Sequence, residues 1–153
     1  MAAKSLTDIG KFYKQVEEFK SKLTQILALF EQKQELIELH KYYDKLILFK
    51  QANVRKPIEY FYESYVILYA TQILKRDESF FLDKVSEIDL QEKRDLCFIS
   101  QVRGIWQKLP QHVKECIWDY VQVICILSEK VIGGEILAMT RENMMSEGTL
   151  SNK

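Results

Sequence analysis

The chain has 153 residues, of which 47% are hydrophobic and 29% charged, and its formal net charge is zero. This length suits one domain with its own core, and the neutral charge excludes a global field that would draw the protein to nucleic acid or to an acidic membrane. With only five glycines and two prolines, the composition favours helices joined by short polar loops over a many-turned β protein.

The first predicted helix covers residues 8–30 and follows Ser5 and Thr7, which are typical N-cap residues. Its apolar residues recur at steps of three and four, at Ile9, Phe12, Val16, Phe19, Leu23, Ile26 and Phe30. We interpret this stripe as packing against the domain core. The alternative is a coiled coil that forms a homo-oligomer through this first helix.

A second apolar stripe begins after the polar run at 31–35 and continues to residue 52. No glycine or proline separates the two stripes, so one long bent helix is the alternative to two helices. We favour two helices, 8–30 and 34–52, because a single helix of about 44 residues would be roughly 66 Å long and would exceed a domain of this size.

The segment after this stripe combines a helix start with a concentration of aromatic residues. Pro57 is well placed to begin a helix, and five rings follow within ten positions, at Tyr60, Phe61, Tyr62, Tyr65 and Tyr69. Rings on nearly every face favour a helix surrounded by other helices, so we predict residues 57–75 at the centre of the fold. Asp77 is expected to cap a short segment whose Phe80 and Phe81 return to the core.

The remaining pattern is also helical. A helix is predicted from Ser86–Asp89 to Leu109, where Pro110 ends it, and a second buried helix covers 111–131 before Gly133 and Gly134. A short amphipathic segment at 135–141 follows. We therefore predict an all-α fold, a compact bundle of about five to six helices around two apolar helices, about 57–75 and 111–131. Residues 1–143 form its single domain, and 144–153 are expected to be a disordered tail.

Residues that could carry chemistry are few and scattered. His40 precedes Asp44 by one turn, but a solvated or capping histidine is favoured over half of a metal site, and His112 is interpreted as a surface group. Three acidic residues lack EF-hand spacing and are interpreted as caps: Asp77, Glu78 and Asp83. Three serines have no neighbouring histidine: Ser79, Ser100 and Ser128. We expect no enzyme, no catalytic residue, no cofactor and no metal.

The three cysteines, Cys97, Cys116 and Cys125, lack metal-ligand spacing. Cys116 and Cys125 are nine residues apart and therefore point to opposite sides of one helix. We expect buried, reduced thiols in a protein that is not secreted, because the N-terminus lacks the apolar core of a signal peptide. No apolar run is long enough to cross a membrane.

Arg55, Lys56, Lys11 and Lys14 are the candidate contacts for phosphate or for a protein partner, because Arg55 and Lys56 lie at a predicted helix N-terminus. Lys22 and Lys33 would extend a basic face. Residues 1–56 hold 11 Lys and Arg against 7 Asp and Glu, whereas the rest of the chain holds 11 against 15. Acidic residues are interleaved with these lysines, so nucleic-acid binding is the less favoured interpretation.

Residues 53–82 resemble a pattern in small helical proteins of the nucleocytoplasmic large DNA viruses. The matching residues are Asn53, Arg55, Lys56, Gln72, Ile73, Leu74, Asp77, Glu78, Phe80, Phe81 and Leu82. Residues 117–130 are similar to the Ile-Trp-x-Tyr-x-Gln helix of the same proteins, with Ile117, Trp118, Tyr120 and Gln122 in those places. The chain departs from the pattern at Val54, where proline is expected, and in the run from Tyr60 to Tyr62. The resemblance implies a viral context and no assigned activity.

Our leading hypothesis is a non-enzymatic helical protein that contacts other viral or host proteins. It would be a small structural or accessory virion component, located in the virion or in the cytoplasm of the infected cell. The alternatives are a nucleic-acid-associated accessory factor for packaging or transcription, and a host-directed interaction protein such as a cell-death regulator.

Overall fold

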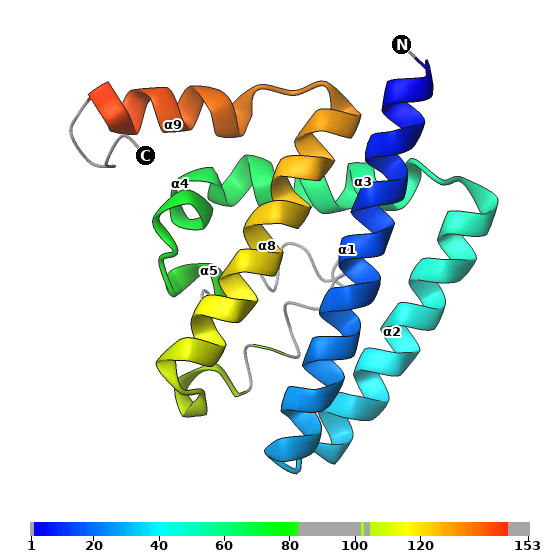
Figure 1. The fold of residues 1–153 in the computed structure, drawn as a ribbon, viewed down its shortest axis with the longest axis vertical. Helices are drawn as coiled ribbons and strands as arrows, with labels where there is room; N and C mark the ends of the chain where they lie inside the picture. The colour runs from blue at the N-terminus through cyan, green and yellow to red at the C-terminus, as the bar shows by residue number, and fades with distance from the viewer. Residues whose placement is uncertain (1, 83–101, 103–104, 147–153) are drawn as a thin grey trace.

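The computed structural model describes residues 2–82, 102 and 105–146, and all regular structure within them is helical (Figure 1). In chain order the elements are α1 (Ala2–Leu29), α2 (Lys33–Ala52), α3 (Lys56–Phe61), the π-helix η1 (Tyr62–Val66), α4 (Ile67–Lys75), α5 (Ser79–Leu82), the 3₁₀ helix η3 (Trp106–Lys108), α8 (Gln111–Ile132) and α9 (Ile136–Ser146). The predicted compact all-α fold is confirmed.

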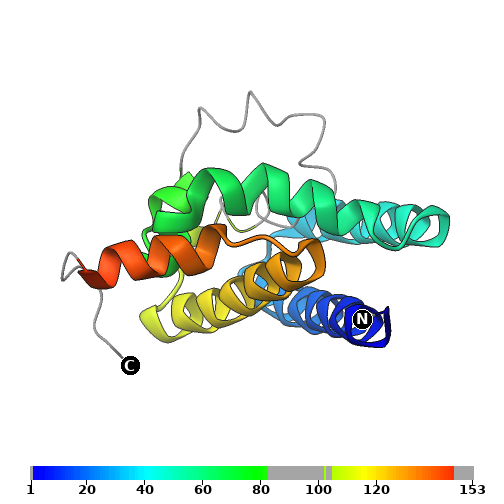
Figure 2. The ribbon, with the colours of Figure 1, turned by 90° about the horizontal axis from the view of Figure 1, so that it is seen from above.

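α1 packs against α2 and α8 and runs antiparallel to both (Figure 1). α3, η1 and α4 follow one another directly and form a rod that lies across α1 and α8 (Figure 2). This rod is kinked within α4 at Tyr69, whose φ of −125° and ψ of 24° are not helical. α9 leaves the C-terminal end of α8 and packs against α4.

The prediction of two N-terminal helices is confirmed, because the chain turns between α1 and α2. Glu31 adopts a left-handed conformation with a φ of 55°, and the amide of Gln32 donates to the carbonyl of Leu27 at 2.9 Å. The predicted N-caps are wrong, because α1 begins at Ala2 and so contains both Ser5 and Thr7. Alanine and lysine at positions 2–4 are strong helix formers that extend the helix beyond these serine and threonine signals.

The apolar stripe of α1 lies inside the domain. Its side chains Ile9, Phe12, Val16, Phe19, Leu23 and Ile26 are all buried, and the interface of α1 with α8 is the most extensive between described helices. Phe19 stacks on Tyr120 of α8 with 5.3 Å between ring centroids. The stripe therefore packs against the core, as the favoured interpretation had it, and α1 joins the two predicted core helices as a third.

The aromatic rod is buried on one side only. Tyr62, Tyr65 and Tyr69 are buried, whereas Ile67 and Leu68 are 47% and 55% exposed. The π-helix η1 places one extra residue in the turn that faces α8, a local widening for which the sequence pattern gives no signal. Among the described residues, the rod therefore packs against the core along one side.

Asp77 caps the segment that follows it, as predicted. Its carboxylate accepts from the Ser79 amide at 3.0 Å, and it follows Arg76, whose left-handed φ of 54° ends α4. Phe80 and Phe81 are then turned into the core and are almost fully buried. Phe81 stacks on Trp106 with a centroid distance of 4.2 Å. This confirms that the segment returns to the core.

The C-terminal helices follow the prediction closely, with one correction. α8 spans Gln111–Ile132, and Gly133 ends it with a φ of 78°. α9 continues to Ser146, so residues 144–146 belong to a helix and not to the predicted tail. The reason is that Met144 lies two turns after Leu137, and both are buried. Residues 147–153 lie outside the described residues, as does most of the helix predicted at 86–109, of which 106–108 form a 3₁₀ turn.

Candidate functional site

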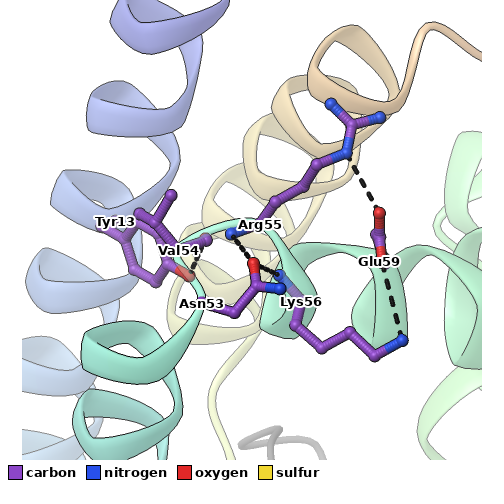
Figure 3. A network of polar contacts seen from close by, with 6 residues as sticks. All are labelled: Tyr13, Asn53, Val54, Arg55, Lys56 and Glu59. Carbon is purple, nitrogen blue, oxygen red and sulfur yellow. Dashed lines mark hydrogen bonds and ion pairs between the residues drawn. The ribbon is translucent and has the colours of Figure 1, made fainter.

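The N-terminal half of α1, the C-terminal end of α2 and the start of α3 meet at one corner of the fold (Figure 3). The Tyr13 hydroxyl donates to the carbonyl oxygen of Val54 at 2.6 Å, which ties α1 to the turn between α2 and α3. Burial raises the pKa of Tyr13, so the hydroxyl keeps the proton that this hydrogen bond requires well into the alkaline range.

The polar groups around the start of α3 are already paired within the chain. The carboxamide oxygen of Asn53 accepts from the amides of Arg55 and Lys56 at 3.1 and 3.2 Å. Glu59 accepts from Arg55 Nε at 3.0 Å and lies 3.9 Å from the Lys56 ammonium (Figure 3). The predicted phosphate position at this helix N-terminus is therefore occupied by Asn53. The Arg55 and Lys56 side chains nevertheless stay 42% and 46% exposed, so a partner can reach them.

Beside these cations, apolar and aromatic side chains reach the surface. Phe49 is 43% exposed and Val54 is 38% exposed. Phe49 packs edge-on against Tyr60 with 6.4 Å between centroids, and the Lys56 ammonium lies 5.1 Å from the Tyr60 ring centroid. We call the set Phe49, Val54, Arg55, Lys56 and Tyr60 the corner patch.

A groove of about 370 Å³ runs beside this patch, between α1 and α2. Its apolar lining includes Val16, Leu46 and Ile47, and Val54 joins it to the corner patch. Lys14 and Lys50 line it from opposite helices, with the Lys50 ammonium 4.4 Å from the Tyr13 ring centroid. We call this feature the α1–α2 groove.

The structure brings three of the four predicted contact residues together. Arg55 and Lys56 belong to the corner patch, and Lys14 lines the adjoining α1–α2 groove. Lys11 is exposed on α1 one turn earlier and does not line this groove. Lys50 was missed by the sequence analysis, although its position four residues after the buried Leu46 places it on the inward side of α2.

A second polar arrangement joins α8, η1 and α9. Glu129 is only 8% exposed, and its Oε1 accepts from the Tyr62 hydroxyl at 2.9 Å and from the Leu137 amide at 2.8 Å. Its Oε2 accepts from the Ala138 amide at 3.3 Å. The carboxylate thus satisfies the first amides of α9, where the helix dipole favours negative charge. Burial and the hydrogen bond to Glu129 raise the pKa of Tyr62 to about 12.

We call the residues Glu129, Tyr62 and Gly134 the α9 latch. A Cβ added at Gly134 would overlap the Tyr62 hydroxyl and lie 2.9 Å from its Cζ, so the hydroxyl reaches the carboxylate only because position 134 has no side chain. All three acceptor contacts of Glu129 are internal to the chain. The α9 latch therefore explains how α9 is fixed and needs no ligand.

The other residues that the sequence analysis weighed have structural roles or are exposed. His40, Asp44 and His112 are all exposed. Glu78 pairs with Lys114 at 3.0 Å, and the hydroxyl of the buried Ser128 donates to the Cys125 carbonyl at 2.7 Å. Cys125 is buried, and Cys116 is only partly buried. Three of these predictions lie outside the described residues: Asp83, Cys97 and Ser100.

In the described part of the chain, no group of three or more His, Cys, Asp or Glu side chains is arranged to hold a metal ion. Among the same residues, no helix combines the length and the apolar character needed to cross a membrane.

No protein-family model, curated protein or solved structure matches the chain. The corner patch and the adjoining α1–α2 groove combine exposed apolar side chains with cations, and a function can be proposed from them.

Proposed function

We propose that the protein is a non-enzymatic interaction protein that binds another protein, viral or host, through the corner patch. The observation that carries this proposal is the exposure of Phe49, which packs on Tyr60, and of Val54, which precedes Arg55. Aromatic residues and arginine are enriched where protein interfaces are buried, and exposed apolar groups rimmed by charges mark such surfaces.

The contacts within the patch support this role energetically. Phe49 and Tyr60 hold each other edge-on, and Arg55 is fixed by Glu59, so these side chains lose little rotamer freedom when a partner covers them. Covering the exposed part of one such ring contributes about 1–2 kcal/mol to binding. Several anchors of this kind are typical of an interface hot spot.

We further propose that the setting is viral and that the protein is a small structural or accessory component of a large DNA virus particle. The support is the order and spacing of the sequence blocks at 53–82 and 117–130. Within the fold, Asn53 and Asp77 from these blocks act as caps, and Phe81 and Trp118 lie in the core. The residues of these blocks thus stabilise the fold, which fits a structural or accessory protein better than an enzyme.

Two experiments test the proposal. Quantitative mass spectrometry of purified virions should find the protein in a fixed ratio to another virion protein, and its absence would end the particle role. Affinity for that protein should fall about tenfold or more in Phe49→Ala and Arg55→Glu. Ile126→Ala is the matched control, because Ile126 is also 43% exposed but lies on α8; an equal loss in this variant would contradict the assignment to the corner.

A nucleic-acid-associated accessory factor is the second candidate. It is favoured by Lys14 and Lys50, which line the α1–α2 groove together with Val54, the residue that precedes Arg55 and Lys56 in the chain. Glu59 already pairs with two of these cations, which is why we rank it second. Binding of a short oligonucleotide should then weaken steeply as salt rises. No binding at low salt would exclude this function.

A further inference from the structure

The α1–α2 groove contains a glycine that the isolated fold does not require. Gly10 lies within the long helix α1 and lines this groove. A Cβ placed there would meet no atom of the described structure within 4 Å, and the backbone has no positive φ at this residue. Glycine is among the least favourable residues in a helix interior, so neither packing nor backbone geometry accounts for it.

An approaching chain would account for Gly10. Glycine is used where another backbone comes close, because it presents no side chain. The same groove is lined by Ile47, which is half-buried, and by the edges of Ile9 and Val16, which are otherwise buried in the core. Amphipathic helices bind to grooves of this kind by inserting apolar side chains spaced three or four residues apart.

The charges along the groove determine what the approaching helix must carry. Lys14 and Lys50 line the groove from its two sides, against one carboxylate, Glu17. Next to the groove, Arg55 follows Val54 at the start of α3, although its charge is paired with Glu59. A segment with carboxylates flanking its apolar residues complements these lysines, whereas a nucleic-acid strand would place phosphates on an apolar floor.

We propose that the α1–α2 groove binds an acidic amphipathic helix of another protein, whose apolar side chains enter the groove at Gly10 and whose carboxylates face Lys14 and Lys50. This inference rests on the proposed protein-binding function and adds the chemistry of the partner. The corner patch would then contact the chain that leads into or out of this helix, because Val54 belongs to both surfaces.

The test uses the full-length chain and a randomised peptide library displayed on phage. Selected peptides should carry Asp or Glu beside apolar residues at helical spacing, and the best synthetic peptide should bind in fluorescence anisotropy. Gly10→Leu and the charge reversals Lys14→Glu and Lys50→Glu should each lower the affinity for this peptide about tenfold or more. The matched controls are Ser21→Leu, at an exposed position of α1 outside the groove, and Lys130→Glu on α8; both should bind as the wild type does.

Gly10→Ala gives the sharpest result, because stability and binding should change in opposite directions. The variant should unfold at a higher temperature than the wild type, since alanine is favoured in a helix, and should nevertheless bind the peptide more weakly. Damage to the fold cannot produce this combination. Unchanged affinity in both Gly10→Leu and Lys14→Glu would overturn the proposal.

Other outcomes also overturn it and identify what replaces it. Selection of basic peptides, or of none, would contradict the assigned partner chemistry. Self-association of the wild type that Gly10→Leu abolishes would make the groove an interface between two copies. If Phe49→Ala weakens binding of the virion partner while the groove variants bind it normally, the groove proposal fails and the proposed function stands. If substitutions in the corner patch and in the groove both leave this binding unchanged, both proposals fail.

Discussion

Glu129→Gln removes the charge of a buried carboxylate while keeping its size. The wild-type side chain accepts three hydrogen bonds, from Tyr62, Leu137 and Ala138. Hydrogen bonds to a charged group contribute about 1.5–3 kcal/mol each against about 1 kcal/mol for neutral pairs, and a partly buried charge at a helix N-terminus adds up to about 2 kcal/mol. The desolvation cost of the carboxylate offsets part of this sum, so we expect the free energy of unfolding to fall by about 2 kcal/mol.

Urea unfolding followed by tryptophan fluorescence measures this change, because Trp106 and Trp118 are both buried in the fold. Glu115→Gln is the control, since Glu115 is an exposed glutamate on the same helix, and it should stay within about 0.5 kcal/mol of the wild type. Hydrogen exchange should accelerate in α9 more than in α1. If Glu129→Gln matches the control and exchange in α9 is unchanged, the carboxylate does not hold α9 and our account of the α9 latch is wrong.

Three further predictions concern the α9 latch and the difference between core and corner-patch side chains. Gly134→Ala should destabilise the protein by about 1–3 kcal/mol through overlap with Tyr62, and combining it with Tyr62→Phe should cost less than the two separate losses together in a double-mutant cycle. The pKa of Tyr62 is raised from 10.0 to about 12. The protonated hydroxyl therefore contributes its full stability below pH 10.0, and this contribution is lost as the pH rises through about 12. Tyr62→Phe should remove this part of the decrease in unfolding free energy at alkaline pH. Phe81→Ala should cost about 3–5 kcal/mol in urea unfolding, whereas Phe49→Ala should cost less than about 1 kcal/mol, and equal losses would contradict the distinction between core and corner.

The sequence predicted the elements that depend on local signals. The stripes of the first two helices, the helix start at Pro57, the cap at Asp77 and the stop at Gly133 each act within a few residues. These signals therefore do not depend on the tertiary arrangement, and the structure has the helix boundaries close to where they were predicted, except that α1 begins at Ala2. The aromatic segment also packs into the core, although only along one side.

The features that were missed depend on residues distant in the chain. The contact of Tyr62 with Glu129 joins positions 67 residues apart, so no window of the sequence predicts a buried glutamate at 129. The α1–α2 groove forms only when α1 and α2 pack antiparallel, and this packing makes Lys14 and Lys50 line the same groove. The candidate cations could be recognised from the sequence by their charge. Which of them lie near one another, and the pairing of Arg55 with Glu59, could be seen only in the folded structure.

We propose that the corner patch is where this protein meets its partner. A photo-reactive amino acid at position 49, in protein incorporated into virus particles, tests it directly, with the same group at position 115 of α8 as the control. We predict a cross-link from position 49 to one other protein and none from position 115. Cross-links from 115 alone, or none from 49 in particles that contain the protein, would contradict the claim.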